Sequence, residues 1–91
     1  MLNAFVLIDA EPAKVATLAE QLTDLPGVSE VYSVTGDDDL VVIIRVKEHD
    51  QLADVVTTEI GCLEGIRRTR TMVAYKAYSR HDLDAIFDVG R

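Results

Sequence analysis

The chain alternates between unbroken aliphatic runs and stretches with helical periodicity. Residues 4–8 and 40–44 are almost entirely apolar and rich in β-branched side chains, which is typical of strands at the centre of a sheet. After each run, apolar side chains recur at steps of three and four residues, which predicts an amphipathic helix that buries one stripe. The two stripes are Val15, Leu18, Ala19, Leu22 and Leu25, and then Leu52, Val55, Val56, Ile60 and Leu63.

Both predicted helices end in the same short signature. Leu25-Pro26-Gly27-Val28 follows the first helix and Leu63-Glu64-Gly65-Ile66 follows the second, 38 residues later. Further strands are predicted after each signature, over residues 28–34 and from Ile66 to about Tyr78. Two β-α-β units in tandem form a ferredoxin-like β-α-β-β-α-β arrangement, an α+β fold with two helices on one face of a four-stranded antiparallel sheet. We expect residues 1–91 to form this single domain.

Residues that favour helix ends refine the predicted bounds of the helices. Pro12 suits the first turn of the first helix, where its missing N–H costs nothing, and Asp50 can cap the second. Ser79 and Asp82 have the spacing of a capping box, so a short C-terminal helix is predicted over about residues 80–88.

The two central strands are also apolar on the side that faces away from the helices. The side chains on that side are Phe5, Leu7, Val41 and Ile43. A monomer rarely exposes an apolar patch of several hundred Å². We therefore expect a two-fold homodimer that pairs the open faces of two sheets, as in dimeric α+β barrels. The alternative is that the C-terminal helix folds over its own sheet, although its apolar residues are too few to cover it.

The charge balance narrows the classes of partner. The formal net charge is −7, with 16 acidic and 9 basic residues, whereas nucleic-acid surfaces need clustered Lys and Arg. No apolar run approaches the roughly 18 residues of a membrane-spanning helix. We therefore expect no direct contact with nucleic acid or membrane, and a cytoplasmic location.

Signatures of catalysis and of metal or cofactor binding are absent from the sequence. The consecutive acids at 37–39 suggest Ca²⁺ or Mg²⁺, but neighbouring side chains on an extended chain point in alternate directions. No local pattern indicates a Ser/His/Asp or Cys/His arrangement, and phosphate-binding glycine loops are missing. We expect no metal, no cofactor and no enzymatic activity.

The turn before the second aliphatic run admits two interpretations. Gly36-Asp37-Asp38-Asp39 is rich in turn-forming residues, so a solvated hairpin turn explains it fully. The same residues also suit a free amino acid, because a carboxylate can hold its ammonium and N–H groups around Gly36 can hold its carboxylate.

Three ordered segments resemble one known family. They are Leu25-Pro26-Gly27-Val28, then Val31 to Leu40 (VYSVTGDDDL), then Gly65 to Thr71 (GIRRTRT). Together they resemble the ligand-sensing RAM domain of the Lrp/AsnC regulators. The chain departs from that family in starting directly at the sensing domain, without the helix-turn-helix, and in carrying Asp38 where the turn usually has an aromatic residue. We therefore expect a stand-alone form.

The resemblance implies an amino-acid or small-metabolite sensor that modulates transcription through assembly with full-length regulators. It implies a ligand cleft between neighbouring dimers in an octamer-like ring of four. The ligand-binding residues that it indicates are Thr35, Gly36, Asp37, Asp38 and Asp39, and with less support Thr69, Arg70 and Thr71. Two alternatives stay open: a small dimeric α+β-barrel enzyme with a polar pocket between sheet and helices, and a purely structural oligomerisation partner.

Overall fold

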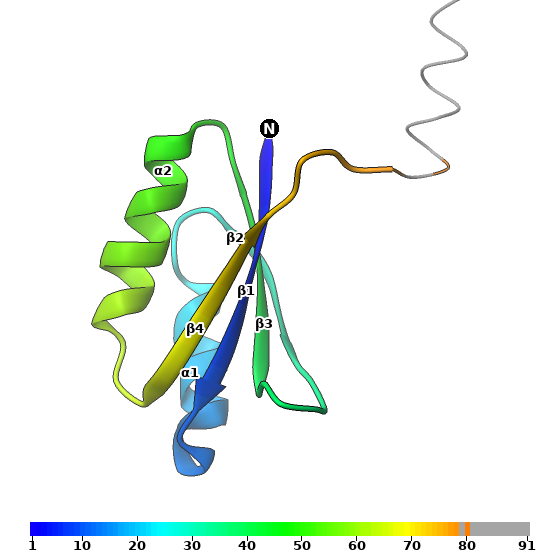
Figure 1. Ribbon diagram of the computed structural model, residues 1–91. Helices are drawn as coiled ribbons and strands as arrows, with labels where there is room; N and C mark the ends of the chain where they lie inside the picture. Colours follow the sequence, from blue (N-terminus) through cyan, green and yellow to red (C-terminus); the bar gives the residue numbers. More distant parts are fainter. Residues whose placement is uncertain (79, 81–91) are drawn as a thin grey trace, which may run out of the picture.

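The protein folds into two layers in the computed structural model, which describes residues 1–78 and 80 (Figure 1). The elements in chain order are β1 (Leu2–Ala10), a 3₁₀ turn (Pro12–Lys14), α1 (Val15–Thr23), β2 (Val28–Ser33), β3 (Leu40–Val46), α2 (His49–Ala53) with a π-helical continuation (Asp54–Glu59) and a closing 3₁₀ turn (Ile60–Cys62), and β4 (Ile66–Val73).

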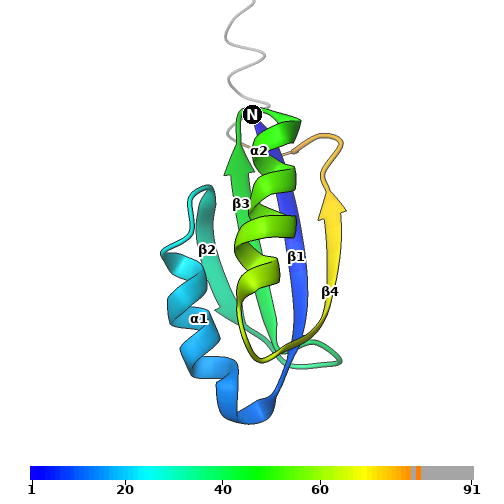
Figure 2. The same ribbon diagram turned by 90° about the vertical axis from the view of Figure 1, so that its left-hand side faces the viewer.

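The four strands form one antiparallel sheet in the order β2-β3-β1-β4. Both helices cover the same face, with β4 lying beyond α2 at the edge (Figure 2). The two aliphatic runs are therefore the two central strands, paired from Leu2 opposite Val46 to Ile8 opposite Leu40. This arrangement confirms the predicted ferredoxin-like fold.

The core lies between the sheet and the helices. Alternate residues of β1 and β3 face it, and Val6, Ile8 and Val42 are fully buried there. Leu18 and Leu22 of α1 pack against them, as the predicted stripe requires. On α2 the buried residues include Val55 and Ile60, whose spacing of five suits the wider turn of the π-helical segment between them.

The start of α2 differs from the prediction. Its N-cap is Glu48, so the predicted cap at Asp50 is wrong. The side-chain oxygen of Gln51 accepts hydrogen bonds from the backbone N–H groups of Lys47 (2.9 Å) and Glu48 (3.1 Å). The Glu48 side chain in turn faces the backbone N–H of Gln51, which completes the reciprocal pattern of a capping box. A long side chain at the third helical position thus displaces the shorter Asp from the capping role.

β4 ends five residues earlier than predicted, at Val73 rather than Tyr78. Its neighbour β1 begins at Leu2, and the last bond between the two segments runs from the Ala74 N–H to the Asn3 carbonyl (2.9 Å). Beyond that point β1 has only Leu2 left, so little of the neighbouring strand remains for the edge strand to pair with. The C-terminal helix predicted over about residues 80–88 lies, apart from Arg80, outside the described residues.

The other face of the sheet carries the predicted apolar patch. Phe5 lies directly opposite Ile43 and Leu7 opposite Val41, so the four side chains form a contiguous block on the central strands. Each is only partly buried, because no element within residues 1–78 packs over this face. The block is hereafter called the open face.

Candidate functional site

The loop between β2 and β3 is fastened to the end of β1. The Val34 N–H donates to the Asp39 carbonyl (3.0 Å) and closes the loop, while the Asp39 N–H donates to the Ile8 carbonyl (2.8 Å). Gly36 has a φ of +113°, yet a Cβ placed there would meet nothing within 4 Å. Glycine is therefore favoured at position 36 by backbone conformation and not by crowding, and the surrounding space is open to a ligand.

The three consecutive aspartates have three different environments. Asp39 accepts the Ala10 N–H on its Oδ2 (2.9 Å) at the point where the pairing of β1 with β4 shifts register. Asp38 is 7% exposed and forms an ion pair with Arg70 of β4. Asp37 is exposed and makes no side-chain hydrogen bond to any residue in the described part of the chain. Of the three carboxylates, Asp37 is therefore the one that is free to hold a ligand.

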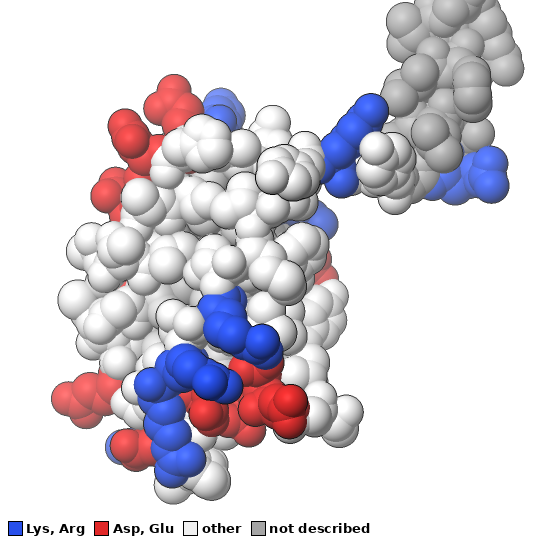
Figure 3. All heavy atoms as spheres, in the orientation of Figure 1, with Lys and Arg blue, Asp and Glu red and all other residues white. Residues whose placement is uncertain are grey.

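Arg70 gives the loop a cation from another strand. It pairs with Leu7 in the register of β1 and β4, so its side chain lies on the open-face side of the sheet. Although one nitrogen binds Asp38, the side chain is 54% exposed, and a guanidinium has further N–H donors to offer. Figure 3 shows Lys and Arg side chains beside Asp and Glu at the end of the molecule where β4 begins.

Thr69 and Thr71 do not join this group. They lie opposite Ile8 and Val6, whose side chains point to the helices, so both threonines are on the helix side of β4. They are nevertheless exposed, because α2 does not extend over this edge strand (Figure 2). The predicted site residues therefore form two sets in one subunit: the loop with Arg70, and the two threonines on the opposite face of β4.

A polar pair beside the open face was not anticipated. The Tyr32 hydroxyl donates to the Glu30 carboxylate, and these residues lie opposite Val41 and Ile43. This hydrogen bond, together with the negative charge of Glu30, raises the pKa of Tyr32. The alternation of apolar and polar residues along 28–34 was the available signal, since it places both side chains on one face.

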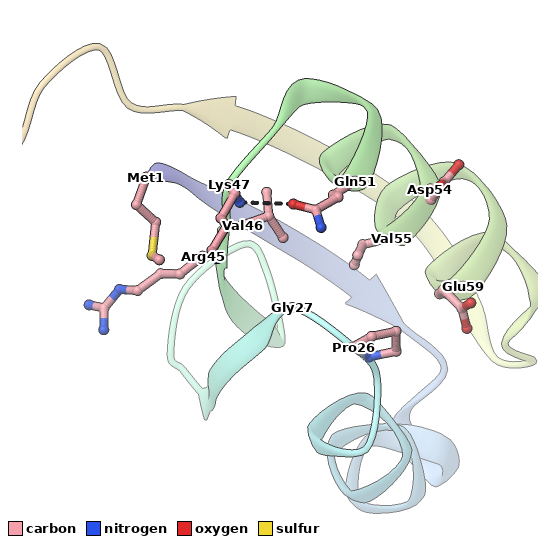
Figure 4. A pocket seen from close by; sticks show the side chains of 10 residues that line it. All are labelled: Met1, Pro26, Gly27, Arg45, Val46, Lys47, Gln51, Asp54, Val55 and Glu59. Atoms are coloured by element: carbon pink, nitrogen blue, oxygen red, sulfur yellow. Dashed lines mark hydrogen bonds between the residues drawn. The ribbon is translucent and has the colours of Figure 1, made fainter.

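A crevice of about 540 Å³ lies at the opposite end of β3, between α2 and the turn that precedes β2 (Figure 4). Its floor includes Val46 and Val55, and the Arg45 side chain extends away from them. Gln51 lines it too, but its oxygen is committed to capping α2. The crevice thus lies at the margin of the helical layer, whereas the interior between sheet and helices is filled by aliphatic side chains.

Other classes of site leave no trace in the described residues. Among residues 1–78 and 80, no three His, Cys, Asp or Glu side chains gather in a group that could hold a metal ion. Neither helix in this part of the chain is long and apolar enough to cross a membrane.

Comparison with known proteins identifies the family of this fold. The model of the Lrp/AsnC ligand-binding domain matches residues 3–83. The solved structure of TTHA0845 from Thermus thermophilus is 50% identical, with a TM-score of 0.83, over 88% of this chain and 100% of that one. FFRP-DM1 is 32% identical, with a TM-score of 0.77, over 81% of this chain and 99% of that one.

Longer relatives are named as regulators. The HTH-type transcriptional regulator FL11 from Pyrococcus furiosus is 37% identical over 75 residues, which are 82% of this chain and 49% of the relative. The chain thus spans about half the length of the curated relatives that it matches, and their names indicate a non-enzymatic role. All elements between residues 1 and 78 are used by the ferredoxin-like fold, so no helix-turn-helix lies among them. The chain belongs to the Lrp/AsnC family and carries that family's ligand-binding (RAM) domain over residues 3–83.

Proposed function

We propose that this chain is a non-enzymatic sensor in which paired subunits bind an amino acid or a similar small metabolite at the loop between β2 and β3. Binding alters the assembly of dimers with one another and with full-length Lrp/AsnC regulators in the cytoplasm, and so modulates transcription. The observation that carries the proposal is that one loop holds an exposed, uncommitted carboxylate, Asp37, between an open Gly36 backbone and the Asp38 that pairs with Arg70.

Dimerisation in this proposal uses the open face. Four side chains are each at least about two thirds buried in one subunit, so a partner sheet removes at most about a third of each from water: Phe5, Leu7, Val41 and Ile43. Full burial of such a side chain stabilises by about 1.5–3 kcal/mol, so eight side chains in two subunits that each bury a further third contribute at most roughly 4–8 kcal/mol before association costs. A dimer at micromolar concentration needs a net gain of about 8 kcal/mol, so further contacts between the subunits must add to the open face.

The ligand chemistry follows from the charges of the loop. An α-amino acid carries an ammonium and a carboxylate on one carbon, and therefore needs an anion and a cation or N–H donors close together. Asp37 supplies the anion, while the unused donors of Arg70 and the N–H groups around Gly36 supply the other half. Thr69 and Thr71, on the far side of β4, contribute from a neighbouring dimer in the cleft of an octamer-like ring.

Two matched variants test the ligand site. We expect a thermal-shift screen of the natural amino acids to find at least one that raises Tm, since a ligand at 100 times its Kd stabilises by about 2.7 kcal/mol per site. Asp37→Ala should abolish that response. Asp54→Ala removes an equally exposed carboxylate at the crevice and should leave the response intact.

Each alternative outcome has a distinct meaning. Loss of the response in Asp54→Ala and not in Asp37→Ala moves the site to the crevice and contradicts the proposal. No response to any amino acid favours a structural oligomerisation partner. An enzyme of the dimeric α+β-barrel type needs a polar pocket between sheet and helices, where Val6, Ile8 and Val42 are instead tightly packed.

A further inference from the structure

The segment that follows β4 leaves the body of the domain. Residues 74–78, here called the arm, follow β4, and the Ala74 N–H makes the last bond to β1 (Figure 1). Tyr75 is 107% exposed, which is the exposure of an extended peptide, and Tyr78 is 75% exposed. The arm's one close aromatic contact in the described chain is internal, with the Lys76 ammonium 5.3 Å from the centre of the Tyr78 ring.

The direction of the arm is the second observation. In Figure 1 the helices lie to the left of the sheet and the arm turns to the right, away from them. Figure 2, seen from the helix side, shows the arm passing behind the sheet. The two views agree that the arm projects beyond the open face and not over the helices. A second copy that covers the open face would therefore lie next to the arm.

We propose that the arms are exchanged: the arm of each subunit packs on the second copy, with Tyr75 and Tyr78 buried against it. This rests on the proposed dimer and adds a second part to its interface. A stable interface typically buries about 800 Å² on each partner. Four partly buried side chains supply only part of that area, and each tyrosine ring can add about 150–250 Å².

Composition and charge favour a second copy as the occupant. Tyrosine is enriched in the centres of protein interfaces, where its ring is buried while its hydroxyl reaches a polar partner. The arm carries one charge, the positive Lys76, whereas the whole chain has a net charge of −7. An arm that reaches a second acidic copy therefore gains electrostatic attraction, while the two copies otherwise repel each other.

Substitution of the arm tests its contribution to the dimer. Sedimentation equilibrium should show a dimer Kd at least tenfold higher for the double variant Tyr75→Ala/Tyr78→Ala. The matched double variant Tyr75→Phe/Tyr78→Phe keeps the rings and should stay within threefold of the wild type. If the alanine variant also stays within threefold while Leu7→Asp dissociates the dimer, the arm proposal is wrong and the open-face dimer stands. If Leu7→Asp has no effect either, the proposed dimer itself fails.

The absence of tryptophan from the chain permits a direct optical test of where the arm packs. Tyr75→Trp places the only tryptophan in the arm. Its emission should be blue-shifted at concentrations where the protein is dimeric, and should move to the red on dilution or in the Leu7→Asp background. Emission that is blue-shifted in the monomer means that the arm folds on its own subunit. Emission typical of exposed tryptophan at every concentration means that nothing covers the arm. Either result overturns the proposal.

Discussion

Asp39 and Asp37 are two residues apart on one loop, yet alanine should lower the stability of the fold at position 39 and leave it almost unchanged at position 37. Asp39→Ala removes the acceptor for the Ala10 N–H, which belongs to a residue only 2% exposed and so finds little water as a substitute. A hydrogen bond to a charged group contributes about 1.5–3 kcal/mol to stability. Because Asp39 is partly exposed, we expect a loss of about 1.5–2 kcal/mol.

The assay is urea unfolding at one fixed protein concentration, since a dimer makes apparent stability depend on concentration. In thermal unfolding the same loss lowers Tm by roughly 6–16 °C for a domain of this size. Asp37→Ala is the matched control, because it removes the same charge from the same loop without a hydrogen bond, and should stay within about 0.5 kcal/mol of the wild type. Asp39→Asn keeps an acceptor and should lose less than about 1 kcal/mol.

Equal stability of Asp39→Ala and Asp37→Ala would refute the division of the loop into a structural and a ligand-binding carboxylate. A change in the m-value alone would instead indicate a change in the compactness of one of the two states.

Two further predictions concern backbone and titration. Gly27 and Gly36 both have positive φ, but only at Gly27 would a Cβ lie 2.7 Å from Val46 Cγ1. Gly27→Ala should therefore lower the free energy of unfolding by roughly 2–4 kcal/mol, and Gly36→Ala by only about 1–2 kcal/mol. Urea unfolding measures both, and equal losses would contradict the close packing at Gly27. Tyr32 should titrate above the ordinary tyrosine pKa in an ultraviolet absorbance titration, and Glu30→Gln should lower that pKa, because the hydrogen bond to Glu30 and its charge both favour the protonated phenol. An unchanged titration in Glu30→Gln would rule out this contact as the cause.

Local pattern was sufficient for the layers of the fold. Alternation along β1 and β3 predicted which side chains face the helices and which form the open face, since successive side chains on a strand point in opposite directions. The predicted end of β4 was wrong for a non-local reason. Residues 72–75 carry no strand-breaking signal, and the strand ends opposite Ala4, close to the first residue of its neighbour β1.

The sequence was sufficient to predict which loop forms the candidate site, but not what each of its aspartates does. Positions 37, 38 and 39 are all aspartate, so the sequence does not distinguish their roles. In the structure Asp38 pairs with Arg70 and Asp39 binds the Ala10 backbone, and both partners are distant in the chain. Arg70 and the two threonines, Thr69 and Thr71, lie on opposite faces of β4 because successive side chains on a strand alternate. The pairing of Asp38 with Arg70, 32 residues apart, has no local signature.

Sedimentation equilibrium at micromolar concentration is the decisive test of whether the apolar sheet surface makes this domain self-associate. We expect a species of about 20 kDa or a multiple of it, twice or more the 10.0 kDa of one chain, and a shift toward 10 kDa in Leu7→Asp. A wild-type protein that remains at 10 kDa across the micromolar range would contradict this expectation, and with it the ligand cleft between dimers and the exchanged arms.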